Sequence, residues 1–449
     1  MDAPRPWMQW ALMWGLLIGC WIGLQHWAPA PPWRSDVGTV RPLQPRVPAL
    51  LGSTRHSPML THAGTDSAWA FLDTLDLEVP ASWALTGSAR AWYELRRFFE
   101  RLPRAKQQRI EVYHWGDSQI EGDRISSVLR SAWQSRWGGR GPGWVLPLTP
   151  APQTAIVATL EDGDVVRRAG FGRGRQPEAL RLPFLAVNEV LDSATWTVRG
   201  NGRASLTHKG WTWTDVWSEA TAHVTLGPGL AGRSNDSLSW RHSPVMEDLT
   251  LSISPQELRG IFLGQTRGVY VHNLPLRGSS GTLFDKVPEA DWAHMRETHP
   301  PALLLLQFGG NAVPGIQSAR EARWFAQRLA NNIRFLEQTF PGVPVVFIGP
   351  SDMGKSPDSY PGLPMVLDAL AAEIPSTGAL HWDLQSAMGG PGSMAEWVQR
   401  GWAASDHVHF TRRGAREAGQ RLEQALAAAW QSMRSLEAVE APLKHPTTP

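Results

Sequence analysis

With 449 residues, of which 42% are hydrophobic and 19% charged, the chain cannot be wholly disordered and is long enough for about two or three domains. Its net charge of +2, from 43 basic and 41 acidic residues, gives no reason to expect nucleic acid as a partner. The single cysteine, Cys20, excludes an internal disulfide framework and a cysteine-based zinc site.

The N-terminal segment, residues 1–33, is predicted to be a membrane anchor or signal segment. No Asp, Glu, Lys or Arg occurs from Pro6 to Trp33, and residues 7–27 are long enough to cross about 30 Å of hydrocarbon as a helix. Tryptophans near both ends are typical of a membrane interface. We expect an uncleaved signal anchor. The alternatives are a cleaved signal peptide and a lipoprotein whose lipid is attached to Cys20, the last residue of a lipobox-like Leu-Ile-Gly-Cys sequence.

The charges beside this segment do not settle its orientation. Arg5 precedes it and three arginines follow it, which by the positive-inside rule would keep the rest of the chain inside the cell. Long domains can nevertheless cross a membrane regardless of such charges, and on the functional grounds given below we place the body in the bacterial periplasm. Residues 34–80 are rich in proline without an apolar period, which predicts a linker.

The body shows an α/β pattern in two stretches, residues 81–149 and 268–438. A helix is predicted over 81–102, and a buried strand over 110–114 leads through Gly116-Asp117-Ser118 into an amphipathic helix. In the second stretch strands alternate with helices, which predicts a doubly wound parallel sheet. The elements predicted there are strands at 269–272, 302–308 and 343–348 and helices at 322–336 and 413–435, before a loose tail at 439–449.

A different pattern lies between the two stretches. Residues 150–267 contain short alternating runs, punctuated by Gly, Pro, Asn and Asp, and this predicts an inserted antiparallel β-sandwich. The aromatic faces of this insert would come from Trp196, Trp211, Trp213, Trp217 and Trp240. Three of them, Trp211, Trp213 and Trp217, share one strand parity and are predicted to point to one face of the sheet.

Chemically useful residues follow strand ends, or precede the last helix, at four places in the α/β stretches. These are Ser118, Gly278 within the loop after strand 269–272, Asn311, and Asp406 with His409. Because ligands collect at the carboxyl ends of strands in open α/β sheets, we expect these residues to share one pocket. Each also has an ordinary structural interpretation as a turn, a helix cap or a solvated side chain.

Taken in order, this set resembles the SGNH, or GDSL-type, hydrolases over residues 105–150 and 265–435. The resemblance implies a three-layer α/β/α, flavodoxin-like fold. It also implies that Ser118 is the nucleophile and His409 the general base, oriented by Asp406. The backbone amides of Ser118 and Gly278 and the side-chain amide of Asn311 would form the oxyanion hole. The chemistry is coherent, because a serine hydroxyl needs an imidazole to take its proton and the imidazole needs an acceptor on its other nitrogen.

The chain departs from the family pattern at several positions. Gln119 replaces the leucine of the GDSL signature, and Ala312 replaces an aspartate common after the asparagine. Gly281 competes with Gly278 for the glycine position. His407 competes with His409 for the role of base, but His409 keeps the Asp-x-x-His spacing.

The β-rich insert is similar to the arrangement in peptidoglycan O-acetylesterases of this group, which makes Trp211, Trp213 and Trp217 candidate sugar contacts, with core packing as the alternative. We therefore expect a membrane-tethered, extracytoplasmic serine esterase that removes O-acetyl groups from a cell-wall or exported polysaccharide. An acyl-Ser118 intermediate would form, and no cofactor or metal is expected.

Three alternatives remain at this stage. An O-acetyltransferase would use the same triad to pass acetyl from a membrane-bound O-acyltransferase partner to a polymer. A non-catalytic polysaccharide-binding or assembly protein would retain only the hydrolase frame, although all four blocks are intact. A metal hydrolase built on His407 and His409 would lack further clustered ligands in the sequence.

Overall fold

The computed structural model describes residues 79–440 except 173, 202–209, 219–223, 227–229, 234–238 and 255. All of them belong to one compact unit. The predicted membrane segment, nearly all of the linker and the last nine residues of the tail lie outside the described part. Among the described residues, no helix combines the length and the apolar character needed to cross a membrane.

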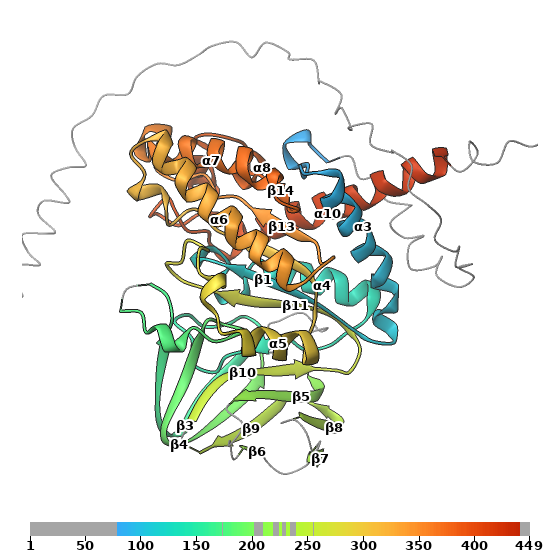
Figure 1. Cartoon of the computed structure of the whole chain (residues 1–449). Helices are drawn as coiled ribbons and strands as arrows, with labels where there is room; N and C mark the ends of the chain where they lie inside the picture. Colours follow the sequence, from blue (N-terminus) through green and yellow to red (C-terminus); the bar gives the residue numbers. More distant parts are fainter. Residues whose placement is uncertain are drawn as a thin grey trace, which may run out of the picture. The chain divides into compact units, whose positions relative to one another are not determined.

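A five-stranded parallel sheet forms the centre of the α/β part (Figure 1). Its strands lie in the order β11-β1-β12-β13-β14, and every neighbouring pair is parallel. The strands are β1 (Arg109–Gly116), β11 (Gly268–Pro275), β12 (Pro301–Gln307), β13 (Val345–Ile348) and β14 (Leu380–Trp382). Nearly every strand residue is buried, because helices cover both faces of such a sheet. The predicted doubly wound parallel sheet is confirmed.

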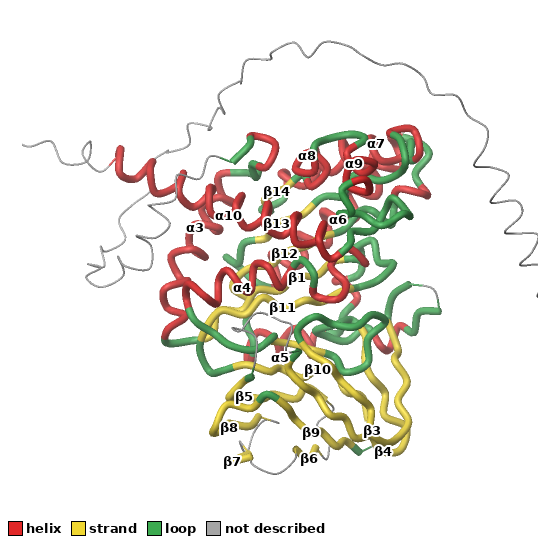
Figure 2. The backbone as a smooth tube through the Cα atoms, turned by 180° about the vertical axis from the view of Figure 1, so that it is seen from behind, coloured by secondary structure: helices red, strands yellow, loops and turns green. Residues whose placement is uncertain are grey.

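Alternate residues of the strands enter two separate apolar cores. Leu303 and Leu305 of β12 face one core, and Leu304 and Leu306 face the other, as the two-residue period of a strand requires. The first core is closed by α3 (Ala89–Arg101), α4 (Ser126–Trp137), α8 (Leu384–Met388), α9 (Ser393–Gln399) and α10 (Arg412–Glu440). The second is closed by α5 (Glu289–Thr298), α6 (Ala319–Thr339) and α7 (Gly362–Glu373). Figure 2 shows α4 alongside β11 from behind.

The strand order fixes where a ligand can bind. From β1 the chain reaches β11 on one side of β1 and β12 on the other, so the strand order reverses beside β1. In open α/β sheets the crevice at such a point, outside the carboxyl ends of the strands, is where ligands bind. The loops that follow β1 and β12 begin with Asp117 and Phe308, and they carry Ser118 and Asn311.

The predicted helix over 81–102 is wrong at its start. A short 3₁₀ turn at Ala81–Trp83 is followed by extended chain, in which Thr86 forms an isolated antiparallel bridge with His381 of β14. The helix itself, α3, begins after Ser88, whose side chain accepts a hydrogen bond from the Ala91 N–H and so caps it.

The inserted module is one continuous antiparallel sheet rather than the two separate sheets of the predicted sandwich. Its strands are β2 (Gly143–Val145), β3 (Ile156–Ala169), β4 (Ala186–Gly200), β5 (Trp211–Ser218), β6 (Val224–Leu226), β7 (Leu230–Arg233), β8 (Ser239–Met246), β9 (Asp248–Ile253) and β10 (Gln256–Gly264). The long strand β4 pairs with β3 on one edge and with both β9 and β10 on the other, so the sheet branches there. Residues of both branches share one apolar core.

A buried polar cluster joins the two sheets. His299, which follows α5, contacts Glu111 of β1 through Nδ1 at 2.9 Å and Asp215 of β5 through Nε2 at 3.0 Å. His272 of β11 contacts Glu111 through Nε2 at 3.2 Å and accepts a hydrogen bond from the Trp144 N–H of β2. Two carboxylates face both nitrogens of His299, and they raise its pKa even though burial alone would lower it. Charge therefore fixes the insert against the parallel sheet.

Candidate active site

Ser118 is held at the carboxyl end of β1 by a tight turn. Gly116 ends the strand, and a Cβ on it would lie 3.1 Å from both the Gln307 carbonyl oxygen and the Ile120 side chain. Asp117 then caps a 3₁₀ helix, η4 (Ser118–Asp123), by accepting a hydrogen bond from the Gln119 N–H at 2.9 Å. The serine is therefore the first residue of a helical turn, where its own N–H has no intrahelical partner.

Three of the predicted residues form a hydrogen-bonded chain. Ser118 Oγ lies 2.9 Å from His409 Nε2, and His409 Nδ1 lies 2.8 Å from Asp406 Oδ2. The other oxygen of Asp406 accepts hydrogen bonds from the backbone N–H groups of Val408 and His409. This is the arrangement of nucleophile, base and orienting carboxylate found in serine hydrolases.

The Asp406 carboxylate of this hydrogen-bonded triad stays ionised. Partial burial of Asp406 would raise its pKa, but hydrogen bonds from the backbone and side chain of His409 outweigh that effect and lower it. With Oδ2 fixed on Nδ1, the tautomer of His409 that carries the Nδ1 proton is favoured, so Nε2 is free to accept the proton of Ser118.

His407 takes no part in the hydrogen-bonded series of Ser118, His409 and Asp406. Its backbone adopts a left-handed conformation, with φ of 56°, and its carbonyl accepts a hydrogen bond from the Gly354 N–H. The structure thus brings His409, and not His407, to Ser118.

Two residues that the sequence analysis did not assign hold the histidine loop in place. Gln119 donates to the Val408 carbonyl at 2.6 Å and accepts from the Phe410 N–H at 3.2 Å, so it spans His409 on both sides. Arg124 donates to the carbonyls of Phe410 at 2.7 Å and Ser118 at 3.3 Å. The departure from leucine at position 119 was the one sequence signal for this role.

The predicted oxyanion donors are placed as follows. Ser279 N–H bonds the Leu276 carbonyl, which makes a turn with Gly278 at its third position, and the φ of 81° at Gly278 is the value a type II turn requires there. The Gly281 N–H already donates to Ser279 Oγ. Within the described residues the N–H groups of Ser118 and Gly278 have no protein acceptor, which favours Gly278 over Gly281 as the donor.

Asn311 is oriented through the same turn. Its Nδ2 donates to the Ser279 carbonyl at 3.0 Å, and because an amide nitrogen carries two hydrogens, one remains for a ligand. Asn311 lines the cavity beside Ser118, whereas Gly278 is outside that lining. Of the five predicted positions, Ser118, Asn311 and His409 line one cavity, and Asp406 is hydrogen-bonded to His409. The fifth, Gly278, precedes Ser279, whose carbonyl accepts the hydrogen bond from Asn311.

Two hollows meet at the catalytic pair. The first, which we name the acyl cavity, has a volume of about 140 Å³ and is lined by Ser118, Asn311, Phe308, Pro350, Met353, Tyr360 and neighbouring residues. The second, the arginine hollow, has a volume of about 350 Å³ and is lined by Ser118, His409, Glu121, Arg124, Arg277, Arg412 and three small neighbours. Ser118 and His409 are in both linings, so they stand at the junction.

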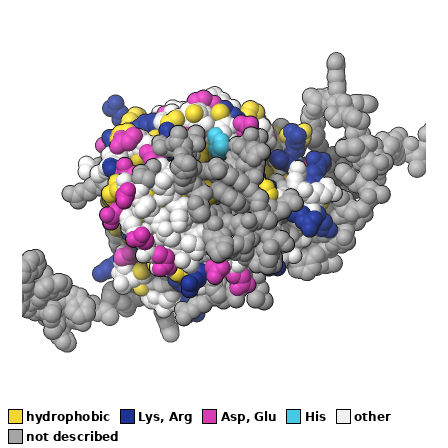
Figure 3. Space-filling model, turned by 90° about the horizontal axis from the view of Figure 1, so that it is seen from below, with side chains coloured by type: hydrophobic (Ala, Val, Ile, Leu, Met, Phe, Trp, Pro, Cys, Tyr) yellow, Lys and Arg dark blue, Asp and Glu magenta, His cyan; other side chains and the backbone are white. Residues whose placement is uncertain are grey.

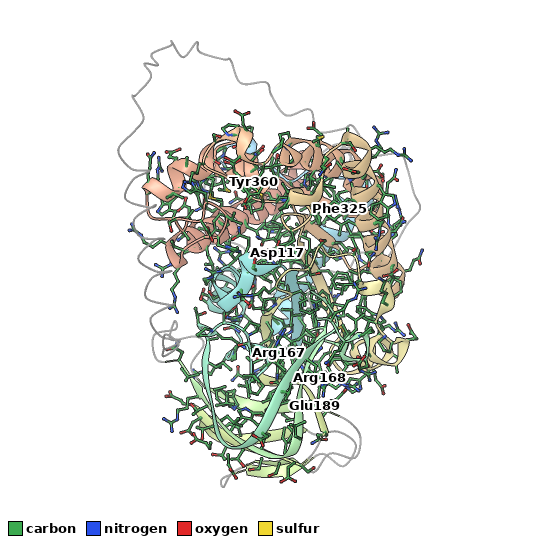
Figure 4. The ribbon with its side chains drawn as sticks, turned by 90° about the vertical axis from the view of Figure 1, so that its left-hand side faces the viewer. Asp117, Arg167, Arg168, Glu189, Phe325 and Tyr360 are labelled. Atoms are coloured by element: carbon green, nitrogen blue, oxygen red, sulfur yellow. The ribbon has the colours of Figure 1, made fainter. Side chains whose placement is uncertain are left out.

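Asp117 adds an unusual acid to the acyl cavity. Burial raises its pKa to about 6, although the hydrogen bond from the Gln119 N–H and the nearby His409 act in the opposite direction. Figure 4 shows Asp117 at the centre of the α/β part, below Tyr360, which lines the same cavity.

The prediction that Trp211, Trp213 and Trp217 point to one face is wrong, and core packing, the alternative to sugar contact, holds for Trp211 and Trp217. Trp211 and Trp217 are 0% and 6% exposed, so neither can contact a polymer in this structure. The pairing of β5 with β8 shifts register between Trp211 and Trp213, and this irregularity breaks the parity. Trp211 enters the core of the insert, whereas Trp217 packs 5.7 Å from Trp144 in the second core and Trp213 donates to Asp215. Trp196 is also buried, and the side chain of Trp240 lies outside the described residues.

Comparison with known proteins identifies the fold. No protein-family model and no curated protein matches the chain. A solved structure of a peptidoglycan O-acetylesterase aligns with 78% of this chain and 99% of its own, at 19% identity and a TM-score of 0.62. A lipase/acylhydrolase from Enterococcus faecalis (16% identity, 36% and 77% covered, TM-score 0.26) and a family two carbohydrate esterase from Cellvibrio japonicus (9%, 62% and 99%, 0.27) score too low to support an argument. The predicted resemblance to SGNH hydrolases is confirmed at the level of the fold.

Proposed function

We propose that the protein is a serine esterase that removes O-acetyl groups from a polysaccharide. The observation that carries this proposal is the chain Ser118 Oγ, His409 Nε2, His409 Nδ1 and Asp406 Oδ2, with contacts of 2.9 and 2.8 Å, at the edge of a cavity that also contains Asn311. The fold shared with a peptidoglycan O-acetylesterase supports a glycan as the substrate.

The proposed reaction has two steps. Ser118 Oγ attacks the ester carbonyl carbon while its proton passes to His409 Nε2, and the tetrahedral oxygen receives hydrogen bonds from the Ser118 and Gly278 amides and from Asn311. The bond to the sugar oxygen breaks, and His409 returns the proton to that oxygen. A water molecule, deprotonated by His409, then attacks acetyl-Ser118 and releases acetate and the free serine.

Two features favour a short acyl group and water as its acceptor. The acyl cavity, at about 140 Å³, is smaller than the 300 Å³ or more that is usual for larger ligands, so an acetyl group suits it better than a long chain. The side chains of His409 and Asp406 are 43% and 49% exposed, which leaves water free to reach the base.

We further propose that the enzyme is tethered to the bacterial inner membrane through residues 1–33 and acts in the periplasm. The support is the uncharged apolar run at residues 7–27 and the proline-rich linker that follows it. Cell-wall and exported polysaccharides are the acetylated glycans that such a tether would leave within reach.

The experiment is an assay of the purified protein with O-acetylated peptidoglycan or another acetylated polysaccharide, with and without an unacetylated acceptor glycan. An esterase releases free acetate in both cases, and Ser118→Ala abolishes the release. If the acetyl group instead moves to the acceptor glycan at the expense of free acetate, the protein is an O-acetyltransferase, and a membrane-bound O-acyltransferase becomes its expected partner. If neither free acetate nor acetylated acceptor forms above the level seen with Ser118→Ala, the alternative of a non-catalytic polysaccharide-binding protein is favoured.

A further inference from the structure

The side of Ser118 that faces away from the acyl cavity is strongly basic. Arg124, Arg277 and Arg412 line the arginine hollow together with the nucleophile and the base, whereas Glu121 is the one acidic side chain in that lining. Burial lowers the pKa of Arg124, and the like charges of Arg412 and Arg277 lower it further against the opposing effect of Glu121. Three cations therefore act on each other across this hollow.

The one carboxylate does not neutralise the cluster. Glu121 is engaged by Arg277, whose Nε donates to Oε1 at 2.8 Å and whose Nη2 donates to Oε2. Among the described residues, the hydrogen bonds of Arg124 go only to carbonyl oxygens, those of Glu121, Phe410 and Ser118. Within the described part of the chain, neither Arg124 nor Arg412 has a carboxylate within ion-pair distance. Arg412 is exposed at the start of α10 and lines the hollow, so its charge is accessible to a ligand there.

A fourth arginine extends the positive region toward the insert. Arg167 of β3 interacts electrostatically with both Glu121 and Arg277, and its Nε is buried without a hydrogen-bond partner among the described residues. Figure 4 places Arg167 below Asp117, on the side of the inserted sheet. This positive charge is local, because the whole chain carries only +2 and the face seen in Figure 3 shows acidic and basic side chains together.

The position of the arginines tells which part of the substrate they meet. Asn311 lines the acyl cavity, so the carbonyl and its acetyl methyl occupy that side, and the sugar must leave through the other side of Ser118. We propose that the substrate is an acidic polysaccharide, in which the acetylated sugar or its neighbour carries an anionic group that binds Arg277 and Arg412. Planar guanidinium groups bind carboxylates and phosphates through paired hydrogen bonds, which suits this task. This inference rests on the proposed function.

The test compares one polymer with and without its charge. Initial rates are measured for an O-acetylated uronic acid polymer and for the same polymer after its carboxyl groups have been reduced to alcohols, with an acetylated glycan bearing phosphodiesters as a third arm. We expect the wild type to show a kcat/KM about tenfold or more higher for an anionic polymer than for the reduced one, because a charge-assisted hydrogen bond contributes about one tenfold step. The preference should shrink as salt is added. Whichever anionic arm is preferred identifies carboxylate or phosphate.

Arg412→Gln should reduce that preference about tenfold, mainly by raising KM for the anionic polymer, and Arg277→Gln should act in the same direction. Arg413→Gln is the matched control, because Arg413 is the next residue, is also exposed and lies outside the lining. Equal rates on charged and reduced polymers, or a preference that Arg412→Gln leaves intact, would overturn the inference while the esterase remains. If the wild type releases acetate neither from any of the three polymers nor from 4-nitrophenyl acetate, the proposed function itself is overturned.

Discussion

Gln119 offers a quantitative test of how the base is positioned. Its side chain makes hydrogen bonds to the Val408 carbonyl, the Phe410 N–H and Ser351 Oγ, at 2.6, 3.2 and 3.1 Å. Replacement by leucine, the residue that the GDSL signature has there, removes all three and leaves the buried Phe410 N–H unpaired. A buried unpaired group costs about 1–3 kcal/mol, so we expect Gln119→Leu to lower the free energy of unfolding by about 1–3 kcal/mol.

The effect on catalysis separates positioning from general stability. If residues 408 and 410 relax, His409 moves relative to Ser118, and a displacement of about 1 Å costs roughly 100-fold in rate. We expect kcat to fall about 10- to 100-fold with little change in KM, measured by acetate release well below the melting temperature. Gln134→Leu is the control, since Gln134 is also buried and its Nε2 donates to the carbonyls of Gly141 and Val269, outside both hollows. Equal kcat in the two variants would refute the positioning role.

Three further outcomes are expected. In the wild type, the free energy of unfolding should fall by up to about 3 kcal/mol as pH rises from about 4 to 6, because the pKa of Asp117 is about 6 in the folded state against 3.8 in the unfolded state. Asp117→Asn should abolish this fall. The prediction is contradicted if the free energies of unfolding of both proteins, measured with urea, change equally over this pH range. His299→Gln should lower the free energy of unfolding by about 3 kcal/mol at pH 6 and by less at higher pH. The reason is that the pKa of His299 is raised in the folded state, so its stabilising effect is fully present below about pH 6.5 and is lost as pH rises through the folded-state pKa. A loss of stability that does not depend on pH would count against this. Asn311→Ala should lower kcat about 100- to 1000-fold, because one oxyanion donor is lost. Thermal stability should change little, because the side chain is exposed. An unchanged kcat would exclude the role of Asn311 as an oxyanion donor.

The parallel sheet was readable from the sequence because its signals are local. Residues 302–306 are apolar at every position, a pattern that suits a strand buried on both faces. The roles of Ser118, Asp406 and His409 were assigned through the resemblance to SGNH hydrolases, and the motifs that carry it are local: Asp406 and His409 are three residues apart, and Ser118 lies two residues after the end of β1. What the sequence could not supply was the distance of 2.9 Å between two residues that are 291 positions apart.

The features that were missed depend on long-range pairing. The β5 register shift that separates Trp211 from Trp217 is decided by the partner strand, and no property of residues 211–217 reveals it. Strand β14 has only three residues, too few to show a period. The arginines of the hollow come from the residue after η4, the turn after β11 and the start of α10, and only the fold brings them together.

The most direct test of the account is intact-protein mass spectrometry after treatment with a fluorophosphonate, followed by peptide mapping. The account predicts one adduct, on Ser118, with labelling lost in Ser118→Ala and at least 100-fold slower in His409→Ala, because the neutral hydroxyl then lacks its base. An adduct on another residue, or labelling of Ser118 that proceeds equally fast without His409, would contradict it.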